Sequence, residues 1–190
     1  MRKKSGAWRS VLAVLVTVLS VGGAYFLGMV IELFGQERDP GTITGAPLPS
    51  VLVQAREVEQ QAIARGLAIE TDKQILFGDL HVHTTNSTDA FLWSLPIYGG
   101  EGTHPLADAC DFARHCSAID FWAITDHAEA STPKRWQDAK QSIRACNALA
   151  DGTEDPDLVS FIGFEWTQVG QTPEEHYGHK NVIFRDLEDA

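Results

Sequence analysis

The sequence predicts an α/β fold in which parallel strands alternate with helices, as in an open parallel sheet or a β/α barrel. Three strand-like runs carry this prediction: residues 75–83 (ILFGDLHVH), 119–125 (IDFWAIT) and 158–166 (LVSFIGFEW). Helical patterns over 104–117 and 132–152 separate them. This alternation favours a parallel sheet, because each helix returns the chain to the start of the next strand. The second run is almost continuously apolar, which is typical of a strand covered on both faces.

The N-terminal segment predicts one membrane anchor. Residues 1–9 form a basic cytoplasmic tail with no acidic residue. Residues 10–31 carry no charge, and as a helix they would be about 33 Å long, enough to cross the hydrocarbon core of a bilayer. Basic residues before this segment and acidic residues after it predict a signal anchor in the inner membrane, with the rest of the chain periplasmic or extracellular. A cleaved signal peptide is the alternative, although its apolar run usually spans only about 7–15 residues.

A linker and one packing helix come before the first strand. Residues 32–50 have the Gly, Pro and Thr content of a linker. Residues 51–70 predict a helix that packs on the domain and ends near Gly66. Residues 71–190 are the predicted catalytic domain. The expected packing face of the helix consists of Val51, Ala55, Val58 and Ala62.

Polar side chains gather at the carboxyl ends of the predicted strands. In the first strand Asp79, His81 and His83 alternate with apolar residues, so the three side chains point to one face. The second strand ends in Asp126 and His127. In parallel α/β folds the carboxyl ends of the strands meet at one edge of the sheet, so we expect these side chains to converge there.

Further residues of the types that bind metals lie at and after the end of the third predicted strand. Glu165 lies at the end of the third strand, and His176 and His179 come shortly afterwards. Each motif alone has an ordinary explanation, since a His-x-His pair can be a surface feature and Thr-Asp-His can cap a helix. Their joint placement predicts a metal site. Imidazoles and carboxylates form a mixed ligand shell that suits Zn, Mn or Fe and leaves room for water.

Four stretches carry a family resemblance: HVHTTNSTDA, AITDHAE, IGFEW and HKNVIF. In order and spacing they resemble the motifs of the PHP (polymerase and histidinol phosphatase) superfamily, and more closely its bacterial branch known as domain of unknown function 3604. The resemblance covers about residues 72–186. It implies a distorted, TIM-like β/α barrel that holds two or three divalent metal ions and hydrolyses a phosphoester or a related bond.

The resemblance also implies roles for individual residues. Asp89 closes the first motif one residue later than in the commonest spacing. Two roles are therefore open for it: a metal ligand, or a residue that orients a ligand from outside. Asp126 is the candidate catalytic residue, and with Asp79 it would orient ligand imidazoles. His179 is favoured over His176 because it directly precedes the last apolar strand. The implied metal ligands are His81, His83, Asp89, His127, Glu165 and His179.

The superfamily completes its site with further histidines and an Asp-x-His pair near the carboxyl end, and neither follows the HKNVIF motif in the sequence up to Ala190. Residues 71–190 are therefore expected to be the N-terminal part of the domain. Three explanations stay open: the sequence is a piece of a longer protein, the remaining part is supplied by a partner, or the chain is a decayed copy.

The predicted function is that of a membrane-anchored, exported, metal-dependent hydrolase that cleaves a phosphoester in a small-molecule or glycan substrate. Hydrolysis of an N-acyl amide on a glycan is the enzymatic alternative, because the same metal site can polarise a carbonyl. A non-catalytic metal-binding fragment is the alternative from another class. The net charge of −11 would repel phosphate backbones, so no nucleic acid partner is expected.

Three cysteines would face an oxidising compartment if the domain is exported. Cys110 and Cys116 lie on one predicted helix about 9 Å apart along its axis, too far for a disulfide. Cys116 and Cys146 lie near the corresponding ends of successive helices, which pack about 8–10 Å apart. The prediction is a Cys116–Cys146 disulfide with Cys110 reduced; three free thiols are the alternative.

Overall fold

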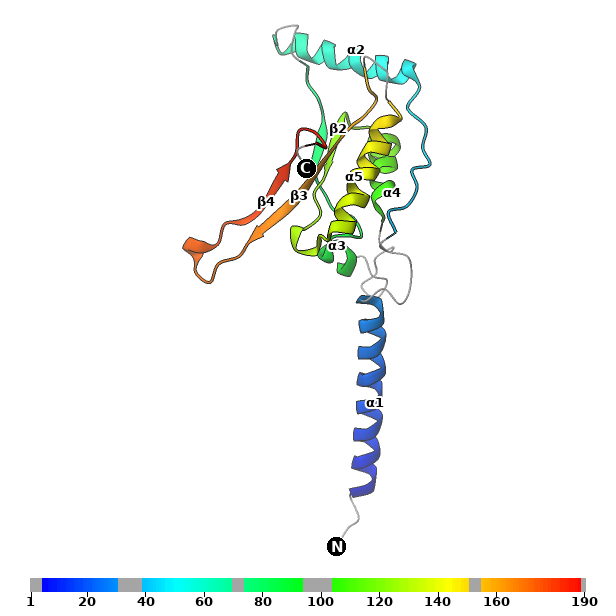
Figure 1. Ribbon diagram of the computed structural model, residues 1–190, viewed down its shortest axis with the longest axis vertical. Coiled ribbons are helices and arrows are strands. Elements are labelled where there is room, and N and C mark those ends of the chain that lie inside the picture. The colour runs from blue at the N-terminus through cyan, green and yellow to red at the C-terminus, as the bar shows by residue number, and fades with distance from the viewer. Residues whose placement is uncertain (1–4, 31–38, 70–73, 94–103, 151–154, 189–190) are drawn as a thin grey trace. The chain divides into compact units, whose positions relative to one another are not determined.

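The chain divides into two compact units, residues 1–38 and residues 39–190, which are described separately. Figure 1 shows the computed structural model. The structure describes residues 5–30, 39–69, 74–93, 104–150 and 155–188.

The first unit contains one helix, α1 (Ser5–Val30). Its segment Trp8–Gly28 has a mean hydropathy of 2.1 and is long and apolar enough to cross a membrane. This agrees with the apolar helix predicted over residues 10–31. The same length and composition are found in signal sequences near an N-terminus, so the helix by itself does not distinguish an anchor from a cleaved signal.

The second unit begins with a segment that lies on the domain, which we call the strap (residues 39–49). The Pro40 carbonyl accepts a hydrogen bond of 2.9 Å from the Ala107 amide at one end of the strap. At its other end the Leu48 amide donates to Asp157 Oδ2 over 2.7 Å. Residues 32–50 were expected to be a spacer, yet from residue 39 onward the backbone has partners on the domain. Composition predicts the lack of regular secondary structure, whereas these partners come from distant parts of the chain.

Helix α2 (Ser50–Gly66) buries Val53 and Ala64 and contacts the domain through polar side chains of the same face. Arg56 Nε lies 3.1 Å from Asp120 Oδ1, and Gln60 Nε2 donates to Asp120 Oδ2 over 2.7 Å. The face expected to be buried is turned outward, and Val58 is 62% exposed. The expectation about this face is therefore wrong. Apolar spacing shows that a helix has two faces, but the position of Asp120 decides which face meets the domain.

A four-stranded sheet in the order β1-β2-β3-β4 forms the centre of the second unit. Strands β1 (Gly78–Val82), β2 (Phe121–Ile124) and β3 (Val159–Gln168) are parallel, as predicted. Strand β4 (Gly178–Ile183) returns antiparallel to β3. The intervening residues contain only a short 3-10 turn, η4 (Pro173–Glu175). A parallel crossover needs about a dozen residues or more, so this connection makes a hairpin instead.

The sheet curls strongly, so that its first and last strands approach each other. Asn181 on β4 donates through Nδ2 to the Leu80 carbonyl on β1 over 2.7 Å. The β1–β2 register is irregular between Asp79 and Val82, which is consistent with the Leu80 carbonyl accepting from outside that pair. The result is a mixed α/β unit with a half-barrel sheet. Its concave side holds the polar residues discussed below.

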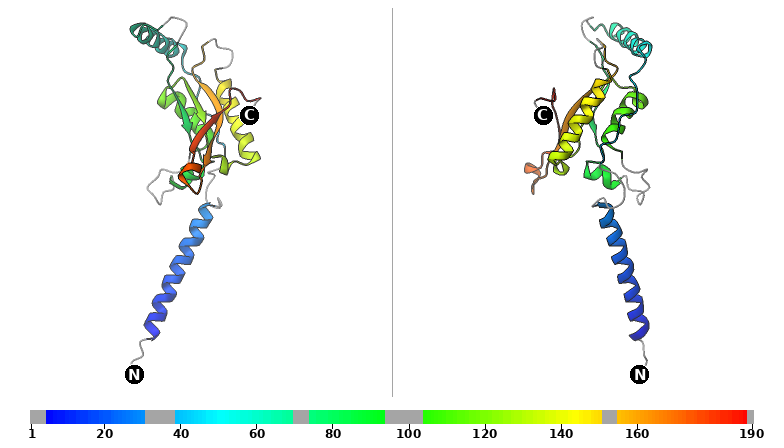
Figure 2. Two further views of the ribbon diagram at one scale, coloured as in Figure 1. Left: turned by 90° about the vertical axis from the view of Figure 1, so that its left-hand side faces the viewer. Right: turned by 45° about the vertical axis from the view of Figure 1, so that its right-hand side comes forward.

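Two helical segments cover the convex side of the sheet (Figures 1 and 2). Helix α4 (Leu106–Phe112) continues into a π-helical turn, η2 (Ala113–Ser117). Helix α5 (Pro133–Ala148) begins at the predicted N-cap, where the Thr132 side chain accepts from the Arg135 amide over 3.2 Å. The core between these helices and the sheet includes Leu106, Trp122, Ile124, Ile143 and Ile162.

A disulfide joins Cys110 of α4 to Cys146 of α5, with a Cα separation of 6.1 Å, and Cys116 is free and exposed. The predicted Cys116–Cys146 pair is therefore wrong. That prediction considered which helix ends lie close together but not how α4 is rotated about its axis. Cys110 shares the buried face of α4 with Leu106 and Ala113, whereas Cys116 lies on another face of η2.

Candidate metal centre

The structure brings all six predicted ligands together on the concave side of the sheet. Asp89 lies on the short helix α3 (Thr88–Trp93), and His127 precedes the 3-10 turn η3 (Ala128–Ala130). His127 also forms an isolated parallel bridge with Glu165, which continues the alignment of β2 with β3 past the end of β2. His81 lies in β1, His83 directly follows that strand, and His179 lies in β4.

Glu165 is the centre of the cluster, and its side chain is only 3% exposed. Its Oε2 atom lies 2.7 Å from His83 Nε2 and 3.0 Å from His81 Nε2. Its Oε1 atom lies 2.5 Å from His179 Nδ1. Nε2 of His127 is 3.7 Å from Oε2. One buried carboxylate is therefore shared among four imidazoles, two from strands β1 and β4 and two from the segments that follow β1 and β2.

The four imidazoles form a continuous row. Ring centroids are 4.9 Å apart for His81 and His83, and 5.0 Å apart for His83 and His127. The row ends with His127 and His179, whose centroids are 5.2 Å apart. No lysine or arginine is paired with Glu165 among the ion pairs of the described residues.

Asp89 contacts two of these imidazoles, one with each of its carboxylate oxygens. Oδ1 lies 3.2 Å from His83 Nδ1, and Oδ2 lies 3.3 Å from His127 Nε2. Burial alone would raise the pKa of Asp89, but hydrogen bonds from the Ser87 side chain, the Ala90 amide and His83 outweigh it and lower the pKa to about 2. Asp89 is therefore ionised at neutral pH, as a metal ligand must be.

The cluster resolves into three overlapping triads, in each of which one ligand atom per residue lies within 4.8 Å of the others. Every pair of triads shares one residue, so neighbouring ions would share a ligand. The triads are His81–His83–Glu165, His83–Asp89–His127 and His127–Glu165–His179.

The chemistry of these side chains fits a divalent metal. His83 Nε2 is buried and lies close to Glu165, yet the angle is not that of a hydrogen bond, so within the described residues this nitrogen has no hydrogen-bond partner. A buried nitrogen without such a bond is costly unless another group uses its lone pair. Burial raises the pKa of Glu165, but the hydrogen bond from His81 and the charges of nearby histidines lower it overall. Both observations favour a bound cation at this place.

Two hydroxyl groups orient the imidazoles, and sequence reasoning missed both. Thr167 Oγ1 lies 3.1 Å from His127 Nδ1 and 3.4 Å from His179 Nδ1. Ser87 Oγ lies 3.1 Å from His83 Nδ1 and accepts from the His127 amide over 3.1 Å. Thr167 could have been found from its spacing, because it lies two residues after Glu165 and so shares its strand face. Ser87 has no comparable signal.

The two aspartates that were expected to orient imidazoles bind the backbone and Thr84 instead. Asp79 Oδ1 accepts from the His81 amide over 2.9 Å. The two oxygens of Asp126 accept from the Thr84 amide over 2.6 Å and from its hydroxyl over 2.7 Å. Asp126 therefore fixes the loop that follows β1. Burial raises its pKa, and the two bonds from Thr84 oppose that effect.

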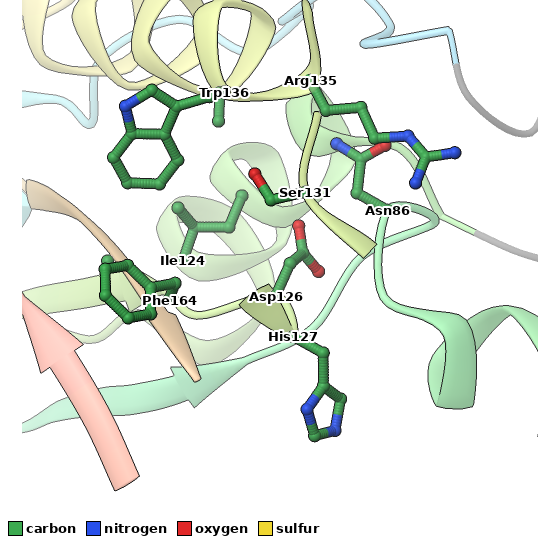
Figure 3. Close-up of a pocket in the computed structure, with 10 residues that line it drawn as sticks. Asn86, Ile124, Asp126, His127, Ser131, Arg135, Trp136 and Phe164 are labelled. Atoms are coloured by element: carbon green, nitrogen blue, oxygen red, sulfur yellow. The ribbon is translucent and has the colours of Figure 1, made fainter. Parts of the chain in front are cut away.

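Figure 3 shows that Asp126 and its neighbour His127 point in opposite directions. The carboxylate of Asp126 is turned toward Ser131, beside a small cavity of about 20 Å³ that is also lined by Asn86 and Arg135. A space of this size has room for about one water molecule. Asp126 thus lies behind the cluster, and its catalytic role remains a prediction. His176 is exposed beyond η4 and belongs to none of the three triads.

Comparison with curated proteins and with solved structures finds no match. A comparison with family models finds one match, over residues 70–148. The matched segment contains His81, His83, Asp89 and His127, whereas Glu165 and His179 lie outside it. Over residues 70–148 the chain is similar to a family described as a protein of unknown function (DUF3604), as the sequence motifs predicted.

Proposed function

We propose that the chain carries the N-terminal part of a PHP-like, metal-dependent hydrolase domain that is anchored in the inner membrane and cleaves a phosphoester. The observation that carries this proposal is the arrangement of three overlapping ligand triads around buried Glu165. Isolated surface histidines do not converge in this way, and a purely structural ion-pair network would not leave His83 Nε2 without a hydrogen bond.

Each triad would supply the ligands of one divalent ion. Glu165 belongs to two triads and would bridge two ions, and His83 and His127 are the other shared residues. Such a set supports two or three ions of Zn, Mn or Fe, since nitrogen and oxygen donors suit all three metals. Bound ions would supply Lewis acidity toward the phosphoryl oxygens and would lower the pKa of a water toward about 7.

The protein's own residues would hold this site in shape. Thr167 orients His127 and His179 through their Nδ1 atoms, which leaves Nε2 of His127 directed at Asp89 and Glu165. Ser87 performs the same task for His83. Asp126, predicted as the catalytic residue, would act through Thr84. Its hydrogen bonds to Thr84 would fix the loop that connects His83 to α3.

Two features support the proposed location. Helix α1 is apolar enough to anchor the chain, and the basic residues before it favour an N-terminus in the cytoplasm. The Cys110–Cys146 disulfide supports an oxidising compartment for the domain, because structural disulfides are rare in the cytoplasm of mesophiles. A reporter that is active only outside the cytoplasm, fused after the domain, should be active and membrane-bound. Activity confined to the cytoplasm would contradict this topology.

The test of the catalytic proposal uses the full chain purified in detergent. Metal content is measured by mass spectrometry, and hydrolysis of bis-(p-nitrophenyl) phosphate and p-nitrophenyl phosphate is measured after chelation and reloading with Mn²⁺, Zn²⁺ or Fe²⁺. We expect metal-dependent hydrolysis that His83→Ala abolishes together with most of the bound metal. His176→Ala, which removes an exposed histidine outside the triads, should change neither quantity.

Two results would overturn the proposal. Unchanged metal content in His83→Ala would remove the metal centre. Metal binding without cleavage of either phosphoester would contradict the proposed phosphoester hydrolase. The same preparation would then be assayed on N-acetylglucosamine. Release of acetate would support the amide alternative, and no release would support non-catalytic metal binding.

A further inference from the structure

A cavity of about 780 Å³ adjoins the metal centre along β1, and we call it the β1 cavity. Its first wall is β1, including the ligands His81 and His83. Its second wall is α4 with η2, from Asp108 to Ser117, and Thr44 and Gly45 of the strap close one side. Because two ligands form part of its lining, a molecule whose reacting group lies on the cluster has room for its remaining part here.

The fixed charges of the β1 cavity are all negative. Asp79 lies on the β1 wall, and Asp108 and Asp111 lie on the α4 wall. The described residues that line the cavity include no lysine and no arginine. Metal ions would offset negative charge only at the end next to His81 and His83. The region away from the cluster therefore has carboxylates without a compensating cation.

The three carboxylates differ in how many hydrogen bonds they already accept from the protein. Asp111 accepts from the Thr44 amide and hydroxyl over 2.9 Å each, and from the Gly45 amide over 3.1 Å, so it is occupied by the strap. Asp79 uses Oδ1 for the His81 amide. Asp108 has only a 3.4 Å contact with His104, and its side chain is 51% exposed. Asp108 is thus the acceptor with the most capacity left for a ligand.

The rest of the lining suits a polar molecule with a flat apolar part. His104 and His115 are exposed on the α4 wall and can donate or accept hydrogen bonds. Phe112 is exposed beside them and offers an aromatic face. A second phosphate or a carboxylate placed here would meet like charges and no donor with a positive charge, which disfavours it.

We infer that the β1 cavity binds the leaving-group alcohol of the substrate, and that this alcohol carries hydrogen-bond donors, either hydroxyl or ammonium groups, and no negative charge. Nucleotides, polyphosphates and other substrates with a second anion are then excluded by Asp79 and Asp108. The inference rests on the proposed function, because it names the substrate class of the same site. Hydroxyl and ammonium groups share the donor chemistry, and the test below separates them.

Cys116 provides a readout that does not need turnover. It lines the β1 cavity, and it is the free, exposed cysteine of the three in the chain. Under non-reducing conditions a thiol reagent therefore labels this position alone, and a ligand in the cavity slows the labelling. The probes are 4-(aminomethyl)phenol, 4-(hydroxymethyl)phenol and 4-hydroxyphenylacetate, which share one ring and differ in the charge of one group.

We expect the ammonium and hydroxymethyl probes to slow the labelling of Cys116 and the carboxylate probe to have no effect. Asp108→Asn should weaken protection by the ammonium probe by about fivefold, as for one partly exposed charge pair, and should leave the hydroxymethyl probe nearly unchanged. Asp108→Lys should give protection to the carboxylate probe. Glu59→Gln, which removes an exposed acid from α2 outside the cavity, should change none of these rates.

The corresponding aryl phosphates extend the test to the reaction. With metal-loaded full chain, kcat/KM for the ammonium and hydroxymethyl esters should exceed that for the carboxylate ester. If none of the three esters is cleaved while the protection pattern holds, the proposed hydrolase fails and the assignment of the cavity stands. Protection by the carboxylate probe equal to that by the ammonium probe, or protection unaffected by either Asp108 substitution, overturns the inference.

Discussion

Oε2 of Glu165 lies 2.7 Å from Nε2 of His83, although helices α3, α4 and α5 and strand β2 separate the two residues in the chain. Nε2 of His83 and the side chain of Glu165 are buried, and the contact lacks the angle of a hydrogen bond. This relationship defines the candidate metal centre, because the same oxygen also meets His81, and the other oxygen meets His179.

The shared position of Glu165 predicts how its substitution changes metal stoichiometry. Glu165→Gln removes the bridging charge from two triads but leaves His83, Asp89 and His127 in place. We therefore expect the metal content of the purified full chain to fall to about one ion per chain, since a neutral amide is a poor ligand for these metals. Metal analysis and equilibrium dialysis measure this. Glu175→Gln, an exposed acid on η4, is the matched control, and an unchanged stoichiometry in Glu165→Gln would contradict the bridging role.

Thr167 should tune metal affinity without being a ligand. Thr167→Val keeps the side-chain volume and removes the hydroxyl that contacts Nδ1 of His127 and of His179. Loss of such an outer partner typically weakens metal binding by about 10–100-fold. Competition with a chelator measures the change, and Thr167→Ser should restore most of the affinity because it restores the hydroxyl. If Val and Ser behave alike, the hydroxyl has no orienting role.

The disulfide predicts that substitutions of Cys110 and of Cys116 differ in their effect on the stability of the domain. Cys110 and Cys146 close a loop with a sequence separation of 36, and Cys110→Ser should lower the free energy of unfolding of the domain by about 2–4 kcal/mol. Cys116→Ser should have almost no effect, because Cys116 is exposed and free. Denaturant unfolding followed by tryptophan fluorescence measures both, and peptide mapping of the non-reduced protein identifies the pair. A Cys116–Cys146 peptide would contradict the structure.

Asp111 predicts a dependence of stability on pH. Burial raises its pKa, but hydrogen bonds from Thr44 and Gly45 and the nearby His115 lower it overall in the folded state. The unfolded chain then binds the proton more readily, so the stabilisation is present above the ordinary aspartate pKa of about 4 and is lost as pH falls through the lower, folded value.

The measurement compares Asp111→Asn with the natural chain between about pH 3 and pH 7. The free energy of unfolding of the natural chain should exceed that of the variant at pH 7, and the difference should shrink toward the acid end. A difference that stays constant over this range would show that the charge of Asp111 does not hold the strap.

The sequence by itself determined the elements that depend on local patterns. Apolar runs bounded by helical patterns predicted β1, β2 and β3 and their parallel order, and Thr132 predicted the start of α5. The alternation of Asp79, His81 and His83 placed the three on one strand face, because the side-chain period of a strand is two residues. Local motifs also predicted similarity to the family over about residues 72–186, and the family match covers residues 70–148.

Only the tertiary structure decided features that depend on how distant segments meet. The burial of α2 through Arg56, the pairing of Cys110 with Cys146 and the contact of Asn181 with Leu80 depend on helix rotation and sheet curl. These geometries arise from packing the whole unit, and local periodicity contains no information about them. For the same reason the role of Thr167 appears only when β3 places it beside His127, and the negative β1 cavity appears only when α4 and η2 lie beside β1.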